Sequence, residues 1–128
     1  MRRTDQRRAA TFALYQQDVT GERKPGEDLT PFAQELAEGV EQHRGELDRL
    51  ISEHAVGWDI DRIAPLERAI LRTALYEILY RPDIPDEVAI DEAVETAKVY
   101  CASEAPAFVN GILGAAMKRL PTGHRGSA

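Results

Sequence analysis

Residues Pro65–Tyr80, with the sequence PLERAILRTALYEILY, decide the fold of this chain. When the segment is placed on a helix, its apolar side chains fall on every side rather than along one face. A helix that is apolar nearly all round is surrounded by protein or by lipid. This one is too short and carries too many charges to span a membrane. The stretch therefore predicts a buried central helix with other helices packed around it.

The charged residues of this central stretch suggest which side of the predicted helix faces solvent or a ligand. Arg68 and Arg72 are four residues apart and so share one strip of the helix. We predict that this strip is the window from the helix to solvent or to a ligand. Glu67 and Glu77 project in other directions, and each needs a partner if it is buried.

Length and composition indicate a small helical protein with a charged surface. The chain has 128 residues, of which 43% are hydrophobic, 6% aromatic and 30% charged, and this predicts one domain with a self-sufficient core. No apolar run is long enough to span a bilayer, and no apolar segment follows the basic start as in a signal peptide. The single cysteine, Cys101, excludes an internal disulfide and suits a reducing cytoplasm. We expect one domain over residues 1–120 and a disordered tail over residues 121–128.

Charge is distributed unevenly along the chain. Residues 1–24 hold six basic and three acidic side chains, whereas the whole chain has a net charge of −6. Such an asymmetry suggests a local contact with a polyanion on an otherwise acidic body. An ordinary solvated terminus is the alternative, and charge alone favours it.

The first helix is predicted over residues 4–19, with Thr4 or Asp5 as its N-cap. Its buried side is expected to come from Ala9, Phe12, Ala13 and Val19. Residues spaced by four form one ridge, made of Arg3, Arg7, Thr11 and Tyr15, with Arg8 beside them. This ridge offers guanidinium groups for phosphates and base edges, and a ring that can stack on an unpaired base. Taken alone, however, Tyr15 is better explained as an amphipathic residue at the margin of the core.

A long helix, or two helices broken near Gly45, is predicted over residues 31–54. Thr30 is the expected N-cap, and Pro31 occupies the first helical position. An apolar stripe follows at alternating spacings of four and three: Phe32, Leu36, Val40, His43, Leu47, Leu50 and His54. No cysteine or carboxylate cluster accompanies the two histidines, so they are interpreted as core-margin residues rather than metal ligands. Trp58 follows as the expected packing anchor between the first half and the central helix.

After a turn that contains two prolines, residues 86–100 form a clearly amphipathic helix. It begins at Asp86 or at Asp91, and the sequence does not decide between them. Its buried face is expected to comprise Ala89, Ile90, Ala93, Val94, Ala97 and Tyr100. Cys101 continues this face and is interpreted as a small core residue rather than a nucleophile.

The last helix is predicted over residues 106–120. Gly111 and Gly114 each cost it about 1 kcal/mol of helix propensity relative to alanine. The simplest reason for two such residues is the close approach of a neighbouring helix. Asn110 should be hydrogen-bonded if it is buried.

The whole chain is therefore predicted to be all-α, with about six helices, because no strand-like alternation of any length appears. The sequence contains no Gly-rich phosphate loop, no zinc-ligand spacing and no nucleophile motif. We expect a binding protein that is not an enzyme and has no metal or other cofactor.

Four segments of the chain resemble the NusB family of bacterial transcription antitermination factors. They are RRAATFALYQQD near the start, ERAILRTALYEILY in the middle, then DIPDEVAIDEAVETAKVY and FVNGILG, in the family's order and spacing. The resemblance extends from about Arg3 to Arg119. It implies a NusB-like helical domain of about six to seven helices in two three-helix bundles, without catalytic activity.

The resemblance also implies partners and a cellular role. NusB proteins pair with NusE, a protein of the small ribosomal subunit, and the pair binds the single-stranded boxA element of nascent RNA, notably in ribosomal RNA operons. The resulting complex keeps RNA polymerase from terminating. NusB-like proteins also self-associate through the face that they use for partners, so a homodimer is an alternative state of the free protein.

Residue by residue, the resemblance implies two groups of contacts. The RNA-binding group is Arg3, Arg7, Arg8, Tyr15, Arg68, Arg72 and Phe108, the last as a ring that stacks on a base. The resemblance places Glu67 near the RNA or partner surface, and we predict that Glu67 and Glu104 contact the partner, although Glu104 departs from the family pattern and adds negative charge close to the expected RNA surface. Glu104 lies in the connection CASEAPA, which lacks the glycine and the basic residue that family members often carry there.

Two other functions remain open from the sequence. The chain could be the NusB-like RNA-binding module of a ribosomal RNA methyltransferase, which would require a separate α/β domain with a Gly-rich loop; the 128 residues contain none. It could also be a helical adaptor that binds only protein. In that case the arginines would pair with an acidic partner or with carboxylates of a second copy.

Overall fold

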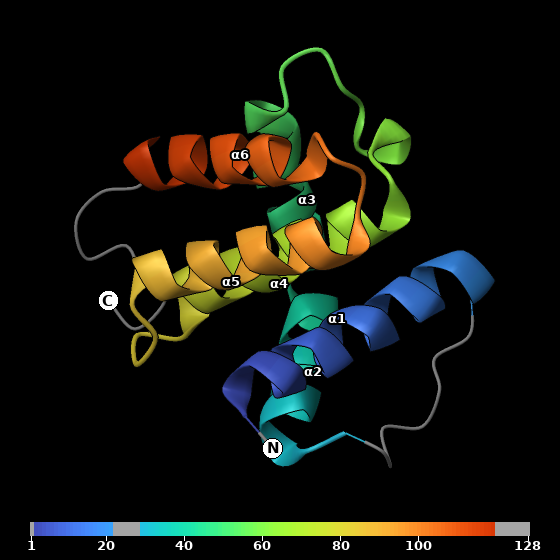
Figure 1. Cartoon of the computed structure of the whole chain (residues 1–128), viewed down its shortest axis with the longest axis vertical. Coiled ribbons are helices and arrows are strands. Elements are labelled where there is room, and N and C mark those ends of the chain that lie inside the picture. The colour runs from blue at the N-terminus through green and yellow to red at the C-terminus, as the bar shows by residue number, and fades with distance from the viewer. Residues whose placement is uncertain (1, 22–28, 120–128) are drawn as a thin grey trace.

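The computed structural model describes residues 2–21 and 29–119, and the side chains of all of these except Arg119. The predicted tail at 121–128 lies outside the described residues, as does most of the predicted loop between the first two helices. The described part contains six α-helices, no strand and one short 3-10 helix, η2 (Ile60–Arg62) (Figure 1). The α-helices are α1 (Arg3–Thr20), α2 (Pro31–Gln42), α3 (Arg44–His54), α4 (Pro65–Tyr80), α5 (Asp86–Tyr100) and α6 (Ala105–Arg119). The all-α prediction is confirmed.

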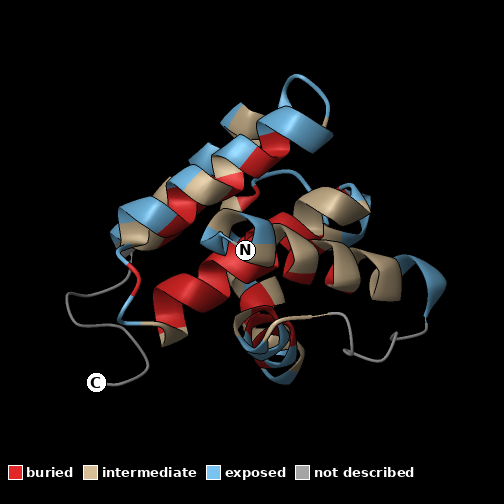
Figure 2. Ribbon diagram, turned by 60° about the horizontal axis from the view of Figure 1, so that its bottom comes forward, coloured by how far each residue is buried: buried red, intermediate tan, exposed pale blue. Residues whose placement is uncertain are grey.

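Helix α4 is the centre of the molecule, as its sequence predicts. Every residue from Ala69 to Leu79 is buried, and α4 contacts each of the other five α-helices. In Figure 2 the buried residues follow the inward sides of the helices, with exposed residues outside them. None of the described helices is long and apolar enough to cross a bilayer.

The other helices form two groups around α4. Helices α1 and α2 pack against each other and against α4, whereas α5 and α6 pack together on another side of it (Figure 1). Helix α3 contacts both α4 and α6. The two groups therefore share one central helix.

Helix α1 is rotated about its axis relative to the prediction. Its N-cap is Arg2, which makes no side-chain capping bond, rather than Thr4 or Asp5. The buried residues of α1 are Arg7, Ala10, Thr11 and Leu14. Val19, expected inside, is 56% exposed. The rotation has a physical cause, because the polar side chains of α1 meet buried polar side chains of α4.

The start of α2 and its approach to α4 are set by two small residues. Thr30 caps α2 as predicted, since its Oγ1 accepts a hydrogen bond of 3.2 Å from the backbone N–H of Ala33. Gly39 faces α4 so closely that an added Cβ would lie 2.1 Å from the ring of Tyr76. The close approach that we predicted at Gly111 and Gly114 is wrong, because an added Cβ at either position would meet nothing within 4 Å.

Residues 31–54 form two helices that are separated at His43, two residues before Gly45, as the second of the two predicted alternatives has it. The His43 ring stacks on Tyr80 at a centroid distance of 4.0 Å, and His43 is half-buried, in agreement with its interpretation as a core-margin residue. Tyr80 in turn donates a short hydrogen bond to Glu46. That hydrogen bond, with burial, raises the pKa of Tyr80 to about 12.

Two aromatic residues that were expected inside lie largely outside. Trp58 is 52% exposed and Tyr100 is 47% exposed, so neither the packing anchor nor the last member of the buried face of α5 is confirmed. Helix α5 starts at Asp86, which settles the alternative with Asp91. In place of Tyr100, α5 buries Thr96, whose hydroxyl donates to the carbonyl of Glu92.

Candidate nucleic-acid interface

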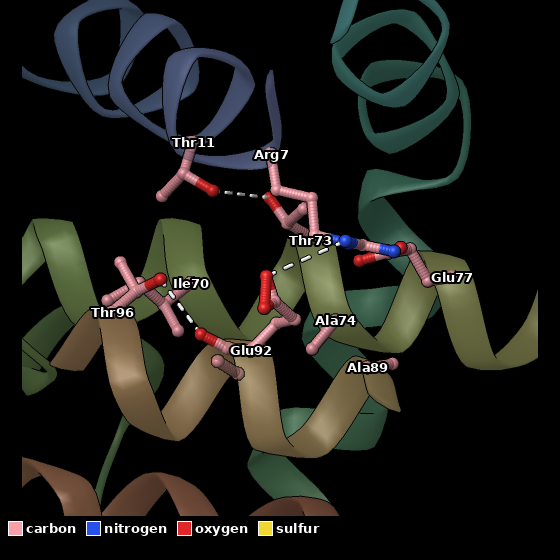
Figure 3. Close-up of a pocket in the computed structure, with 10 residues that line it drawn as sticks. Arg7, Thr11, Ile70, Thr73, Ala74, Glu77, Ala89, Glu92 and Thr96 are labelled. Atoms are coloured by element: carbon pink, nitrogen blue, oxygen red, sulfur yellow. Dashed lines mark hydrogen bonds and ion pairs between the residues drawn. The ribbon is translucent and has the colours of Figure 1, made fainter. Parts of the chain in front are cut away.

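Arg7, a member of the predicted RNA-binding ridge, lies inside the protein. Its Nε donates a hydrogen bond of 2.8 Å to Oε2 of Glu77 on α4, and its Nη1 lies 3.6 Å from Glu92 on α5. Figure 3 shows Arg7 reaching from α1 into the space between these two carboxylates. The Arg7 side chain is 10% exposed and that of Glu77 is 1% exposed. The prediction that Arg7 lies on an open ridge is therefore wrong.

The same interface holds the next ridge residue, one turn further along. Thr11 is buried, and its hydroxyl donates to the hydroxyl of Thr73 at 3.4 Å, while Thr73 donates to the carbonyl of Ala69. We refer to Arg7, Thr11, Thr73 and Glu77 as the α1–α4 interface. Burial raises the pKa of Glu77, although the charge and the hydrogen bond of Arg7 oppose that shift. The ion pair thus supplies the partner that a buried glutamate requires.

Arg3 and Arg8 are the ridge arginines that face outward. Arg3 is exposed, and its guanidinium carbon lies 3.8 Å from the centroid of the Phe32 ring. Arg8 is half-buried, donates a 3.3 Å hydrogen bond to Thr96, and lies over the ring of Tyr100. Neither arginine forms an ion pair with a carboxylate in the described residues. Their positive charge is therefore available to an anionic ligand.

Arg68 and Arg72 do not form a window to solvent, which corrects the prediction. Arg72 is 5% exposed; its Nε lies 2.7 Å from Asp48 and its Nη1 lies 3.1 Å from Asp18. Arg68 shares Asp18 at 3.2 Å and donates to the carbonyl of Ile60. Burial lowers the pKa of Arg72, but Asp48 and Asp18 outweigh it and raise the pKa. These arginines join α4 to α1 and α3.

Tyr15, further along α1, is half-buried and packs against the hydrophobic core. This position agrees with the core-margin interpretation that the residue alone favours. The predicted ridge is thus divided by the fold: Arg3 is exposed, Tyr15 is half-buried, and Arg7 and Thr11 are enclosed.

Phe108, Glu67 and Glu104 meet in one cavity of about 260 Å³, which we call the Trp58 pocket. Trp58 forms its other aromatic wall, with ring centroids 6.2 Å from Phe108 in an edge-to-face arrangement. Burial raises the pKa of Glu67, and the charge of Glu104 raises it further. Arg62 also lines the pocket. The pocket therefore combines two aromatic faces with two carboxylates that repel each other and one guanidinium, so it suits a stacked ring or a hydrogen-bond donor.

The structure brings some predicted site residues together and separates others. Glu67, Glu104 and Phe108 share the Trp58 pocket, whereas Arg7 and Arg72 are parts of internal ion pairs. Sequence reasoning missed the exposure of Trp58 and Tyr100, since apolar residues at helical spacing are normally buried. It also missed Asp18 and Asp48, because no local spacing relates them to Arg72.

The described residues contain no group of three or more histidine, cysteine, aspartate or glutamate side chains that could hold a metal ion. What they do present is an all-helical scaffold with outward arginines on α1 and an aromatic pocket between the start of α4 and the start of α6. The fold and site define a helical binding protein.

Comparison with known proteins gives the family. The model described as "NusB family" matches residues 4–118. The chain belongs to the NusB family.

Individual relatives agree with this assignment. A transcription antitermination protein NusB of Symbiobacterium thermophilum is 40% identical, over 94% of this chain and 92% of its own length. That of Halalkalibacterium halodurans is 42% identical, over 92% and 95%. In Carboxydothermus hydrogenoformans the identity is 48%, over 80% of this chain and 71% of the relative.

Solved structures match the fold over most of its length. T. maritima NusB superposes with a TM-score of 0.83 at 33% identity, covering 93% of this chain and 92% of its own. A structure described as antitermination factors NusB and NusE in complex with dsRNA matches with a TM-score of 0.79 at 27% identity, covering 91% and 96%.

Proposed function

We propose that this chain is a transcription antitermination factor that binds boxA-type single-stranded RNA together with NusE and acts on elongating RNA polymerase, notably at ribosomal RNA operons. The observation that carries the proposal is membership of the NusB family over residues 4–118. It is supported by the name of the relatives, transcription antitermination protein NusB, and by the structural neighbour with NusE and RNA. We infer that the protein acts by binding rather than by catalysis, and in the cytoplasm.

The proposed RNA contacts divide into direct and supporting residues. Arg3 and Arg8 are exposed or half-buried without a carboxylate partner, so they can bind phosphates directly. Phe108 offers a ring in the Trp58 pocket for a base. Tyr15, which is half-buried at the margin of the core, is also a proposed RNA contact. Arg7, Arg68 and Arg72 are occupied by internal carboxylates, and we assign them the role of holding α1, α3 and α4 in place.

Glu67 and Glu104 are proposed contacts for the protein partner. They lie in one pocket without an ion-pair partner in the described residues, and their negative charge suits basic side chains of NusE. A partner that neutralises Glu104 would remove the repulsion between the two carboxylates and so lower the pKa of Glu67. Binding at this pocket is therefore linked to the protonation of Glu67.

The test is an equilibrium binding measurement with boxA-type RNA, with and without NusE, over a series of salt concentrations. Replacing Arg3 or Arg8 by alanine should weaken binding and reduce the magnitude of the salt slope by about one for each phosphate that the variant no longer binds. Arg49→Ala, which removes an exposed arginine of α3, serves as the charge-matched control. Unchanged affinity and slope in both arginine variants would remove the outer side of α1 from the mechanism.

A pull-down with and without ribonuclease separates this function from the protein-only adaptor. Capture of NusE that strengthens in the presence of RNA supports the proposal. Sedimentation of the free protein, then with NusE and RNA added, tests the homodimer. A homodimer that persists unchanged in both mixtures would favour the adaptor.

A further inference from the structure

The end of α5 exposes apolar surface that the core does not use. Tyr100 is 47% exposed and the preceding residue, Val99, is 58% exposed. The other tyrosines of the described helices are more enclosed: Tyr76 is 8% exposed, and Tyr80 stacks between Tyr76 and His43. We refer to Arg8, Phe12, Val99 and Tyr100 as the Tyr100 patch.

The patch is held in position by a regular set of contacts between α1 and α5. Thr4 donates a 2.7 Å hydrogen bond to Glu92, and Arg8 donates to Thr96 at 3.3 Å. One turn further along both helices, the Phe12 and Tyr100 rings meet edge to face at a centroid distance of 4.9 Å. Each contact is one turn from the last on both helices, so the helices run side by side in register. The Tyr100 ring is therefore supported from α1 by its edge-to-face contact with Phe12.

Positive charge lies beside this ring without an internal acid to neutralise it. The Arg8 guanidinium lies over the Tyr100 ring, 5.6 Å from its centroid. In the described residues, Arg8 has a hydrogen bond to the Thr96 hydroxyl but no ion pair with a carboxylate. Its neighbour in sequence, Arg7, is closed in by Glu77 and Glu92. Arg8 thus keeps a charge that no carboxylate of the described residues pairs, and this charge lies next to the Tyr100 ring.

An exposed ring next to an unpaired guanidinium is suited to an unpaired nucleotide. Bases of single-stranded RNA stack on aromatic rings, and the adjacent phosphates bind guanidinium groups. An apolar segment of a partner protein would also cover the ring, but it would leave the Arg8 charge without a counterion. Charge complementarity therefore favours RNA.

We propose that Tyr100 is a stacking platform for an unpaired base of the bound RNA, and that Arg8 binds the phosphate beside that base. This inference rests on the proposed RNA-binding function and adds a contact on α5. The patch adjoins the outer side of α1 through Arg8, so it extends the arginine surface of that helix onto a second element.

The test compares three variants in binding a fluorescently labelled single-stranded boxA-type RNA in the presence of NusE. Tyr100→Leu removes the ring and should raise the Kd by roughly 5- to 150-fold, the range for losing one base stacked on an aromatic side chain. Tyr100→Phe retains the ring and should bind like wild type. Val88→Ala is the control, because it truncates an exposed valine of the same helix three turns before Tyr100 and outside the patch, and it should leave binding unchanged.

A salt series separates stacking from charge. Tyr100→Leu should weaken binding without changing the salt slope, whereas Arg8→Ala should reduce the magnitude of the slope by about one. Thermal unfolding of Tyr100→Leu, followed by circular dichroism, checks that the variant is folded. Wild-type affinity in a folded Tyr100→Leu would overturn the inference and leave the proposed function in place.

Two other outcomes are also decisive. If Tyr100→Leu weakens the binding of NusE when RNA is absent, the patch binds protein and the inference is wrong. If the wild-type protein with NusE does not bind the RNA at all, the proposed function fails, and the stacking platform fails with it.

Discussion

The α1–α4 interface and the Tyr100 patch lie on two sides of α1. The buried interface contains a residue that we expected at the surface, and the exposed patch contains a residue that we expected in the core. The interface holds Arg7, which was expected at the surface, in an ion pair with Glu77. The patch exposes Tyr100, which was expected in the core. Residue type alone therefore does not decide whether a side chain is buried, because a buried acid on another helix can form an ion pair with an arginine and enclose it. Glu77 fixes the rotation of α1, and that rotation turns Arg8 outward.

The largest expected difference between the two regions is in stability, and it comes from removing the buried arginine. Arg7→Leu leaves Glu77 buried without its partner, and we expect a loss of about 3–5 kcal/mol in the free energy of unfolding. Urea denaturation measures it. The matched control is Arg8→Leu, the neighbouring arginine on the outer side, which should change stability by no more than about 0.5 kcal/mol.

A double variant tests the cause of that loss. Arg7→Leu with Glu77→Leu removes both charges and should recover most of the stability, since replacing a whole buried ion pair by apolar residues is often neutral. A double variant as unstable as Arg7→Leu alone would mean that the ion pair is not what Arg7 contributes.

Substitutions at two glycines test the difference in packing between the enclosed and open sides of the molecule. Gly39→Ala drives a methyl group into the ring of Tyr76, so we expect a loss of about 1–3 kcal/mol from overpacking. Gly111→Ala meets open space on α6 and should stabilise the protein by up to about 1 kcal/mol through helix propensity. Thermal melts of the two variants should therefore shift in opposite directions. A shift of the same sign in both would contradict the difference in packing.

Trp58 gives a smaller effect on stability. Because it is half-exposed in its pocket, Trp58→Ala should cost less than about 1 kcal/mol in urea denaturation. The free energy of binding RNA or NusE through the Trp58 pocket should be reduced by more than this change in stability. A loss of several kcal/mol would instead restore Trp58 as the packing anchor that its sequence context suggested.

The smallest effect is electrostatic. Burial and the charge of Glu104 raise the pKa of Glu67 above its ordinary value of 4.5. The folded chain therefore holds this proton more tightly than the unfolded chain, and the resulting stabilisation is complete below pH 4.5 and is lost as the pH rises through the raised pKa. Glu104→Gln should lower the pKa of Glu67, measured by carboxyl carbon NMR during a pH titration. An unchanged pKa in that variant would show that Glu104 does not act on Glu67.

Much of the fold could be predicted because its signals are local. The apolar content of Pro65–Tyr80 predicted the central helix with both of its ends, and Thr30 followed by Pro31 predicted the start of α2. Helix rotation is different, since it depends on which side chains of another helix lie opposite. No local pattern shows that Arg7 meets Glu77 or that Arg72 meets Asp48, residues 70 and 24 positions away.

The candidate site was predictable only in part for the same reason. Phe108 and Glu67 were selected through the family resemblance, Glu104 was noted as a departure from it, and the three meet in one pocket. Tyr100 and Trp58 were assigned to the core because apolar residues at helical spacing usually pack there. Only the three-dimensional arrangement shows that α5 ends with its last ring beyond the edge of the core.

The sharing of α4 by both groups of helices has a consequence for cooperativity. Since α4 contacts every other α-helix, neither group can separate without exposing the apolar surface of the segment from Ala69 to Leu79. Unfolding should therefore occur in a single transition rather than in halves. The amide hydrogens of that segment should exchange with solvent only when the whole domain opens, and should be the slowest to exchange in the protein.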